Sequence, residues 1–73
     1  MNENNKHKED LLAEERELES ALLNGEYGDW KVAKYYEYIL LGLPAPYNMA
    51  PIHAKRQEMR DRINEIREEL KSL

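Results

Sequence analysis

Glycine and proline are confined to two short parts of this chain, and their positions limit where helices can run. Gly25 and Gly28 lie close together, and Gly42 is followed by two prolines within four residues. Both residue types interrupt helices, because glycine is too flexible and proline lacks the amide donor. The long stretches between them are rich in helix-forming residues. The sequence therefore predicts an all-α fold with helices over about residues 9–24, 30–41 and 49–71.

The middle stretch, residues 29–42, holds the only tryptophan and three of the five tyrosines. Asp29 is a favourable N-cap residue, and Gly42 is a favourable C′ residue that ends the helix. The apolar side chains of this stretch form an arc too wide for one neighbouring helix. We therefore expect a short, largely buried helix with a helix on each side. The residues of this arc are Val32, Ala33, Tyr35, Tyr36, Ile39 and Leu40.

The two outer stretches each carry an apolar stripe with the spacing of paired helices. In the first stretch the stripe consists of Leu11, Leu18 and Leu22. In the third stretch it consists of Ile52, Met59, Ile63, Ile66, Leu70 and Leu73. Asn48 is the expected N-cap of the third helix, with Tyr47 and Ile52 placed as a hydrophobic staple.

Charged residues beside the stripes favour an antiparallel arrangement of the outer helices. In an antiparallel pair like edges meet, so that Glu19 is expected to face Arg60 and Glu26 to face His53. The predicted fold is thus a long first and third helix paired antiparallel, with the short aromatic-rich central helix packed across them. An up-down-up bundle with parallel outer helices is the alternative, because the proline-rich loop permits either.

The chain has the length of one domain, which we expect to span residues 9–73 after a flexible segment at residues 1–8. A core this small makes self-association a reasonable expectation. The net charge is −4, there is no cysteine, and no apolar run is long enough to cross a membrane. The polar N-terminus contains no apolar segment typical of a signal peptide, so a cytoplasmic location is expected.

Residue patterns typical of catalysis or cofactor binding are absent from the sequence. His7 and His53 are the only histidines, and neither belongs to a metal-binding spacing. No glycine-rich phosphate loop and no activated nucleophile can be recognised. We therefore predict no enzyme activity, no catalytic or metal-binding residue and no cofactor.

The candidate functional residues are those that the helix pattern leaves near the surface. Trp30, Tyr38 and Leu41 fall towards the polar side of the central helix. They are either covered by the neighbouring turns or form an exposed apolar patch of the kind that marks a protein interface. His53, Arg56 and Arg60 belong to a basic edge of the third helix. That edge suggests phosphate contacts, but acidic residues interleave with it.

Residues 29–64 resemble small helical proteins encoded by bacteriophages and prophages. The matching segments are Asp29-Trp30-Lys31-Val32-x-Lys34-x-Tyr36-Glu37, Leu41-Gly42, Pro46-Tyr47-Asn48 and His53-Ala54-x-Arg56-Gln57-x-x-Arg60-Asp61-x-Ile63-Asn64. The resemblance implies a bacterial cytoplasm and a protein partner from the host or the phage, but no activity. The leading hypothesis is a self-associating protein-interaction module that acts on neither membranes nor nucleic acid. The alternative is a nucleic-acid-related or DNA-mimicking modulator of a host defence system.

Overall fold

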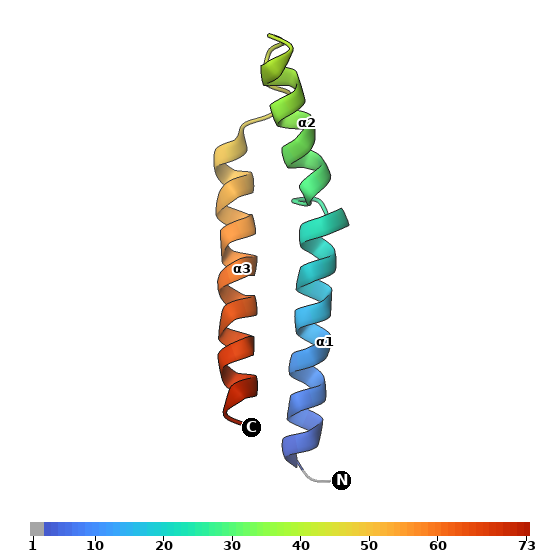
Figure 1. Cartoon of the computed structure of the whole chain (residues 1–73), viewed down its shortest axis with the longest axis vertical. Helices are drawn as coiled ribbons and strands as arrows, with labels where there is room; N and C mark the ends of the chain where they lie inside the picture. Colours follow the sequence, from blue (N-terminus) through green and yellow to red (C-terminus); the bar gives the residue numbers. More distant parts are fainter. Residues whose placement is uncertain (1–2) are drawn as a thin grey trace.

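A computed structural model describes residues 3–73, and all regular secondary structure in that range is α-helical. Helix α1 spans Glu3–Asn24, α2 spans Asp29–Leu40 and α3 spans Met49–Lys71. Together they form a narrow hairpin with principal extents of 57 × 16 × 15 Å (Figure 1). The all-α class predicted from the sequence is confirmed.

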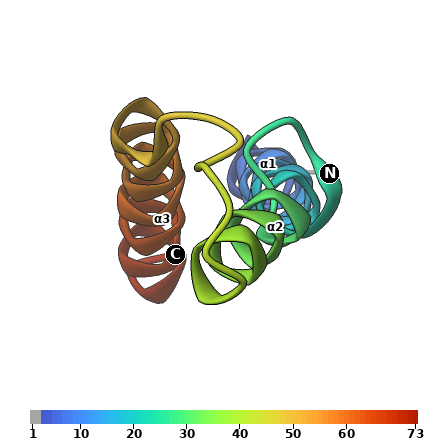
Figure 2. The same ribbon diagram turned by 90° about the horizontal axis from the view of Figure 1, so that it is seen from above.

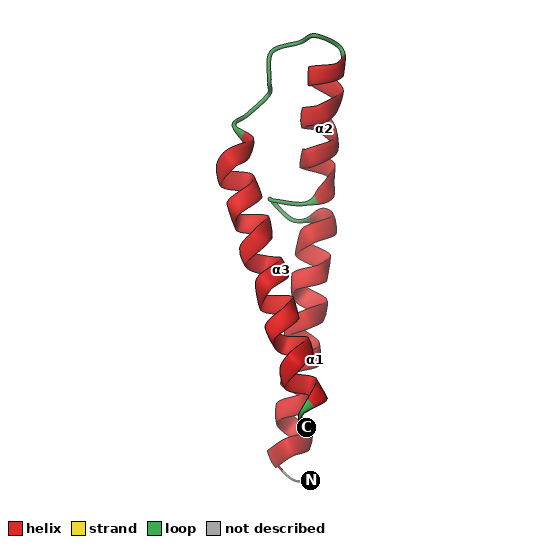
Figure 3. Ribbon diagram, turned by 60° about the vertical axis from the view of Figure 1, so that its left-hand side comes forward, coloured by secondary structure: helices red, strands yellow, loops and turns green. Residues whose placement is uncertain are grey.

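The hairpin has two arms, because α2 continues the direction of α1 (Figures 1 and 3). One arm consists of α1 and α2 with a bend at residues 25–28, and the other arm is α3. The prediction of a distinct central helix packed across the outer pair is therefore wrong. The reason is the tightness of the bend, where Gly28 N donates to Gly25 O and Lys31 N donates to Gly28 O, at 2.9 and 3.0 Å. The chain re-enters a helix at once instead of crossing over.

Helices α1 and α3 run antiparallel, as predicted, and both chain ends lie at the same end of the hairpin (Figure 1). His7 Nε2 lies 3.5 Å from Glu69 Oε1 near these ends. The predicted charge partners are wrong, however. Glu19 accepts a hydrogen bond from Arg67, one heptad beyond the expected Arg60. Arg60 instead donates to Gln57 within its own helix, where the acceptor is only three residues away.

The core lies along the facing sides of α1 and α3. Its buried side chains are Leu11, Ile52, Ile63 and Ile66, and Ile66 is fully enclosed. Leu18, Leu22, Met59 and Leu70 are half-buried around them. The predicted stripes therefore face each other, except that Leu73 at the chain end is exposed.

Two of the three predicted helix-end signals are confirmed. Asn48 caps α3, because its side chain accepts a hydrogen bond from Ala50 N at 2.9 Å. Gly42 has φ 73°, and Leu43 N donates to Tyr38 O, which is the left-handed ending typical of glycine at C′. Asp29 is not the N-cap of α2. Gly28 takes that position without a side-chain cap, because the Asp29 carboxylate accepts from Arg56 instead.

The start of α1 and the burial of α2 also differ from the predictions. Helix α1 begins at Glu3 instead of residue 9, because residues such as Lys6, Lys8 and Glu9 favour helix. The predicted flexible segment is therefore helical from residue 3 onward, and its residues 1 and 2 lie outside the described residues. No side chain of α2 is buried. Only one side of α2 has a neighbour, because α3 lies beside the arm rather than around it (Figure 2).

Candidate protein-interaction surface

The outer side of α2 carries a row of exposed apolar side chains. Tyr36 is 59% exposed, Ile39 47% and Leu40 86%. Ala33 is also exposed. Helical spacing places Ala33, Tyr36 and Leu40 along one line, with Ile39 beside it. We call these four residues the α2 apolar face.

The charged residues next to the α2 apolar face lie along one edge of it. Lys34 and Glu37 are both exposed, and the Lys34 ammonium nitrogen lies 5.8 Å from the centroid of the Tyr38 ring. Val32 lies towards the opposite edge and is half-buried. The face is thus bounded by charge on one side and by aliphatic carbon on the other.

The inner side of α2 rests on the proline-rich loop through Tyr47. The Tyr47 hydroxyl donates to Lys31 O, and its ring lies 6.4 Å from that of Tyr35 and 5.2 Å from Lys31 Nζ. Burial raises the pKa of the Tyr47 hydroxyl, and the nearby Tyr38 adds to the increase. The loop therefore holds α2 from one side and leaves the α2 apolar face uncovered.

Arg56 fastens the bend between α1 and α2 to α3. Its side chain is only 14% exposed, and it donates to Leu22 O at 3.1 Å, Tyr27 O at 2.7 Å and Asp29 Oδ1 at 2.6 Å. Carbonyl groups at a helix end lack partners within the helix. Arg56 supplies such partners at the bend, and it also binds the first residue of α2.

Trp30 makes a further contact at the same bend. Its indole Nε1 donates to Gly25 O at 2.8 Å, and Lys31 Nζ lies 5.7 Å from the ring centroid. Gly28 is required here, because a Cβ on it would lie 2.7 Å from Leu23 O. The bend is thus held by specific contacts. About half of the Trp30 surface nevertheless stays open to solvent.

The six residues singled out in the sequence do not form one surface. Trp30 and Arg56 each bond to groups at the bend, whereas Tyr38 and Leu41 lie at the far end of α2. Leu41 is exposed and Tyr38 is half-buried, which answers a question that the sequence left open. His53 and Arg60 lie on α3, the first exposed and the second half-buried.

The stem formed by α1 and α3 has ion pairs along both edges. Arg62 donates to both carboxylate oxygens of Glu14, at 2.6 and 2.9 Å, and this bond holds the pKa of Glu14 below its ordinary value of 4.5. Arg67 donates to Glu15 and Glu19, which raises the pKa of Arg67. These arginines bridge the arms.

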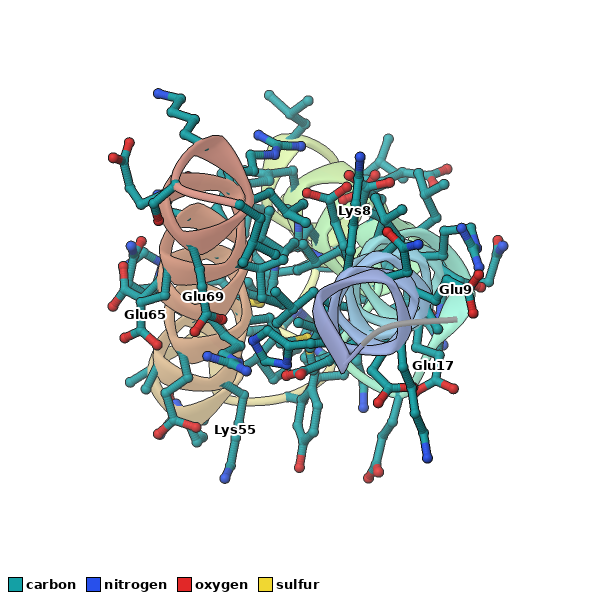
Figure 4. All side chains as sticks on the ribbon, turned by 90° about the horizontal axis from the view of Figure 1, so that it is seen from below. Lys8, Glu9, Glu17, Lys55, Glu65 and Glu69 are labelled. Atoms are coloured by element: carbon teal, nitrogen blue, oxygen red, sulfur yellow. The ribbon has the colours of Figure 1, made fainter. Side chains whose placement is uncertain are left out.

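Other acidic side chains project away from the stem. In the view along the stem, the labelled Glu9 and Glu17 of α1 and Glu65 of α3 point outward from the facing helix (Figure 4). Both outer faces of the stem are therefore charged and solvated, in contrast to the α2 apolar face.

Sequence reasoning missed Tyr36, Ile39 and Leu40 as surface residues, because it assigned them to the core. The signal that could have found them is the width of the apolar arc. An apolar arc that is wide enough to be covered by two helices keeps exposed side chains when only one element packs against it. The residue pattern does not show how many neighbours are supplied.

The described residues show no group of three or more histidine, aspartate and glutamate side chains placed to hold a metal ion. In residues 3–73, no helix combines the length and the apolar character needed to cross a bilayer. Comparison with known proteins gives no match to a family model, to a curated protein or to a solved structure.

Proposed function

We propose that this chain is a non-enzymatic helical protein-interaction module that also self-associates. The observation that carries the proposal is the α2 apolar face, where a leucine that is 86% exposed lies beside an exposed tyrosine and isoleucine. Contiguous apolar surface of this kind is a mark of protein interfaces. The small core, with four buried side chains among the described residues, gives a further reason for the chain to bury apolar surface against another protein.

The rest of the hairpin presents this face. The stem is held by the core and by arginine bridges, and Arg56 and Tyr47 fix α2 to it. The face is therefore held on a supported helix, which lowers the entropy lost on binding. On the resemblance of residues 29–64 alone, we place this activity in the cytoplasm of a phage-carrying bacterium, with a host or phage protein as partner.

The nucleic-acid alternative receives less support from the geometry. Arg56 of the basic edge, and Arg67 further along the same side of α3, donate to groups of α1 and α2, and Lys71 near the end of α3 pairs with Glu68. A phosphate would have to compete with these contacts for the same donor groups. Mimicry of DNA has only the acidic outer faces of the stem in its favour. Binding of a labelled duplex that weakens steeply with salt would favour this alternative.

Affinity capture from a bacterial host lysate tests the proposed function. The bait is the wild-type chain, and the matched control is Leu40→Glu, which changes the most exposed leucine of the face. We expect a partner that the wild type retains and the variant loses. Identical captured proteins for both baits would refute the role of the α2 apolar face.

A further inference from the structure

The charges of the chain are unevenly distributed between α2 and the stem. Helix α2 contains two acidic and two basic residues, whereas the whole chain has a net charge of −4. Two copies that met along their stems would bring like net charge together, which disfavours association. Two copies that met at α2 alone would avoid this cost, because α2 is neutral.

The α2 apolar face has the spacing that pairs helices. Ala33, Tyr36 and Leu40 follow one another by three and four residues, as do Ile63, Ile66 and Leu70 in the stem. In a twofold antiparallel pair, Ala33 of one copy lies opposite Tyr36 of the other. A small side chain then faces a large one twice, which allows close packing.

The flanking residues select this register. In an antiparallel pair like edges meet, so the register that opposes Ala33 to Tyr36 puts Lys34 and Glu37 on the same flank of the interface, two positions or about 3 Å from direct opposition. Symmetry produces this attractive pair twice. The same register brings Leu40 towards the exposed ring of Trp30. A shift by one heptad would instead oppose Glu37 to Ile39 and move Lys34 away from Glu37, so that the attraction between their charges is lost.

We propose that the partner of the α2 apolar face is a second copy of this chain, bound antiparallel about a twofold axis. This inference rests on the proposed function, because it assigns an occupant to the same surface. The two acidic stems then point in opposite directions and remain apart. The interface is isologous, so that each copy contributes the same residues.

Sedimentation equilibrium measures the association at protein concentrations from about 5 to 500 µM. This range of about two decades brackets the Kd expected for a weak interface. We expect a dimer with Kd of about 10–100 µM, since a helix of this length forms a small interface. Leu40→Glu is expected to be monomeric, while Leu73→Glu dimerises like the wild type. Leu73 is a matched control because it is also an exposed leucine but lies at the opposite end of the hairpin (Figure 1).

Charge reversal tests the register. Lys34→Glu and Glu37→Lys each convert two attractive contacts into repulsive ones and should raise Kd by roughly 10-fold. The double variant restores opposite charges and should return to within about threefold of the wild type. Because both residues are exposed, circular dichroism should show unchanged helix content. A double variant no tighter than the singles would overturn the antiparallel register.

The outcomes separate this inference from the proposed function. A wild-type chain that stays monomeric throughout overturns the inference, as does a Leu40→Glu variant that dimerises normally. If the monomeric chain still captures a partner that Leu40→Glu loses, the role of the α2 apolar face in binding another protein stands, and only the self-association is overturned. A dimer abolished by Leu40→Glu and restored by the charge swap supports the inference.

Discussion

Replacing Arg56 by methionine should destabilise the hairpin because it removes the fastening of the bend without removing the aliphatic stem of the side chain. Arg56 makes two charge-assisted bonds to carbonyl groups and one to Asp29. Such bonds contribute about 1.5–3 kcal/mol each when desolvated, but the carbonyl groups at the bend can partly recover water. The pair with half-exposed Asp29 adds at most about 1 kcal/mol.

The expected loss for Arg56→Met is therefore about 2–3 kcal/mol, near the sum of one desolvated carbonyl bond and the ion pair. For a chain of this size that corresponds to a fall in Tm of roughly 10–20 °C. Urea and thermal unfolding followed by far-UV circular dichroism at about 5 µM measure it, a concentration below the expected dimer Kd so that mass action adds little stability.

Two matched variants show how much of the stability loss in Arg56→Met comes from the ion pair and how much from losing a surface cation. Asp29→Asn removes only the ion pair and should cost less than about 1 kcal/mol. Lys55→Met changes the neighbouring cation, whose pair with Glu58 is exposed, and should cost close to nothing. If Arg56→Met costs no more than Lys55→Met, the bend is not held by these bonds and our account of it is refuted.

Three further variants test the core, the α2 apolar face and the stem by thermal melts. Ile66→Ala should cost about 2–5 kcal/mol, because Ile66 is fully enclosed; a loss below 1 kcal/mol would contradict this. Tyr36→Ala should cost less than about 1 kcal/mol at low protein concentration, because the ring is exposed. Glu14 has a lowered pKa, so its contribution is present above pH 4.5 and is lost as the pH falls through the folded-state pKa. Glu14→Gln should therefore lose less stability than the wild type between neutral pH and pH 3, the range of carboxylate titration.

Local signals made the helix ends predictable from sequence. Asn48 and Gly42 act through their own backbone neighbourhood, and both fulfil the predicted roles. Asp29 has the same local chemistry, but a guanidinium 27 residues later competes for its carboxylate. A capping rule considers only neighbouring residues in the sequence, so it does not include a competing side chain this far away.

The heptad stripes predicted which faces of the outer helices meet. Apolar residues spaced like Ile63 and Ile66 line one side of a helix, and that side faces the partner helix in any antiparallel pair. They did not predict the ion-pair partners, because long arginine side chains reach either of two turns. The position of α2 depended on the angle of the bend at Gly25 and Gly28. Residue identity indicates that such a bend exists but not its direction, and the α2 apolar face was misassigned for that reason.

The narrow shape of the hairpin has a consequence for chromatography. The radius of gyration is 16.3 Å, whereas a compact chain of this length would have about 11 Å. A rod of these dimensions elutes from a gel-filtration column ahead of a compact protein of equal mass. The monomer should therefore appear about twice its true mass against globular standards, and light scattering coupled to the column should report 8.7 kDa across the same peak.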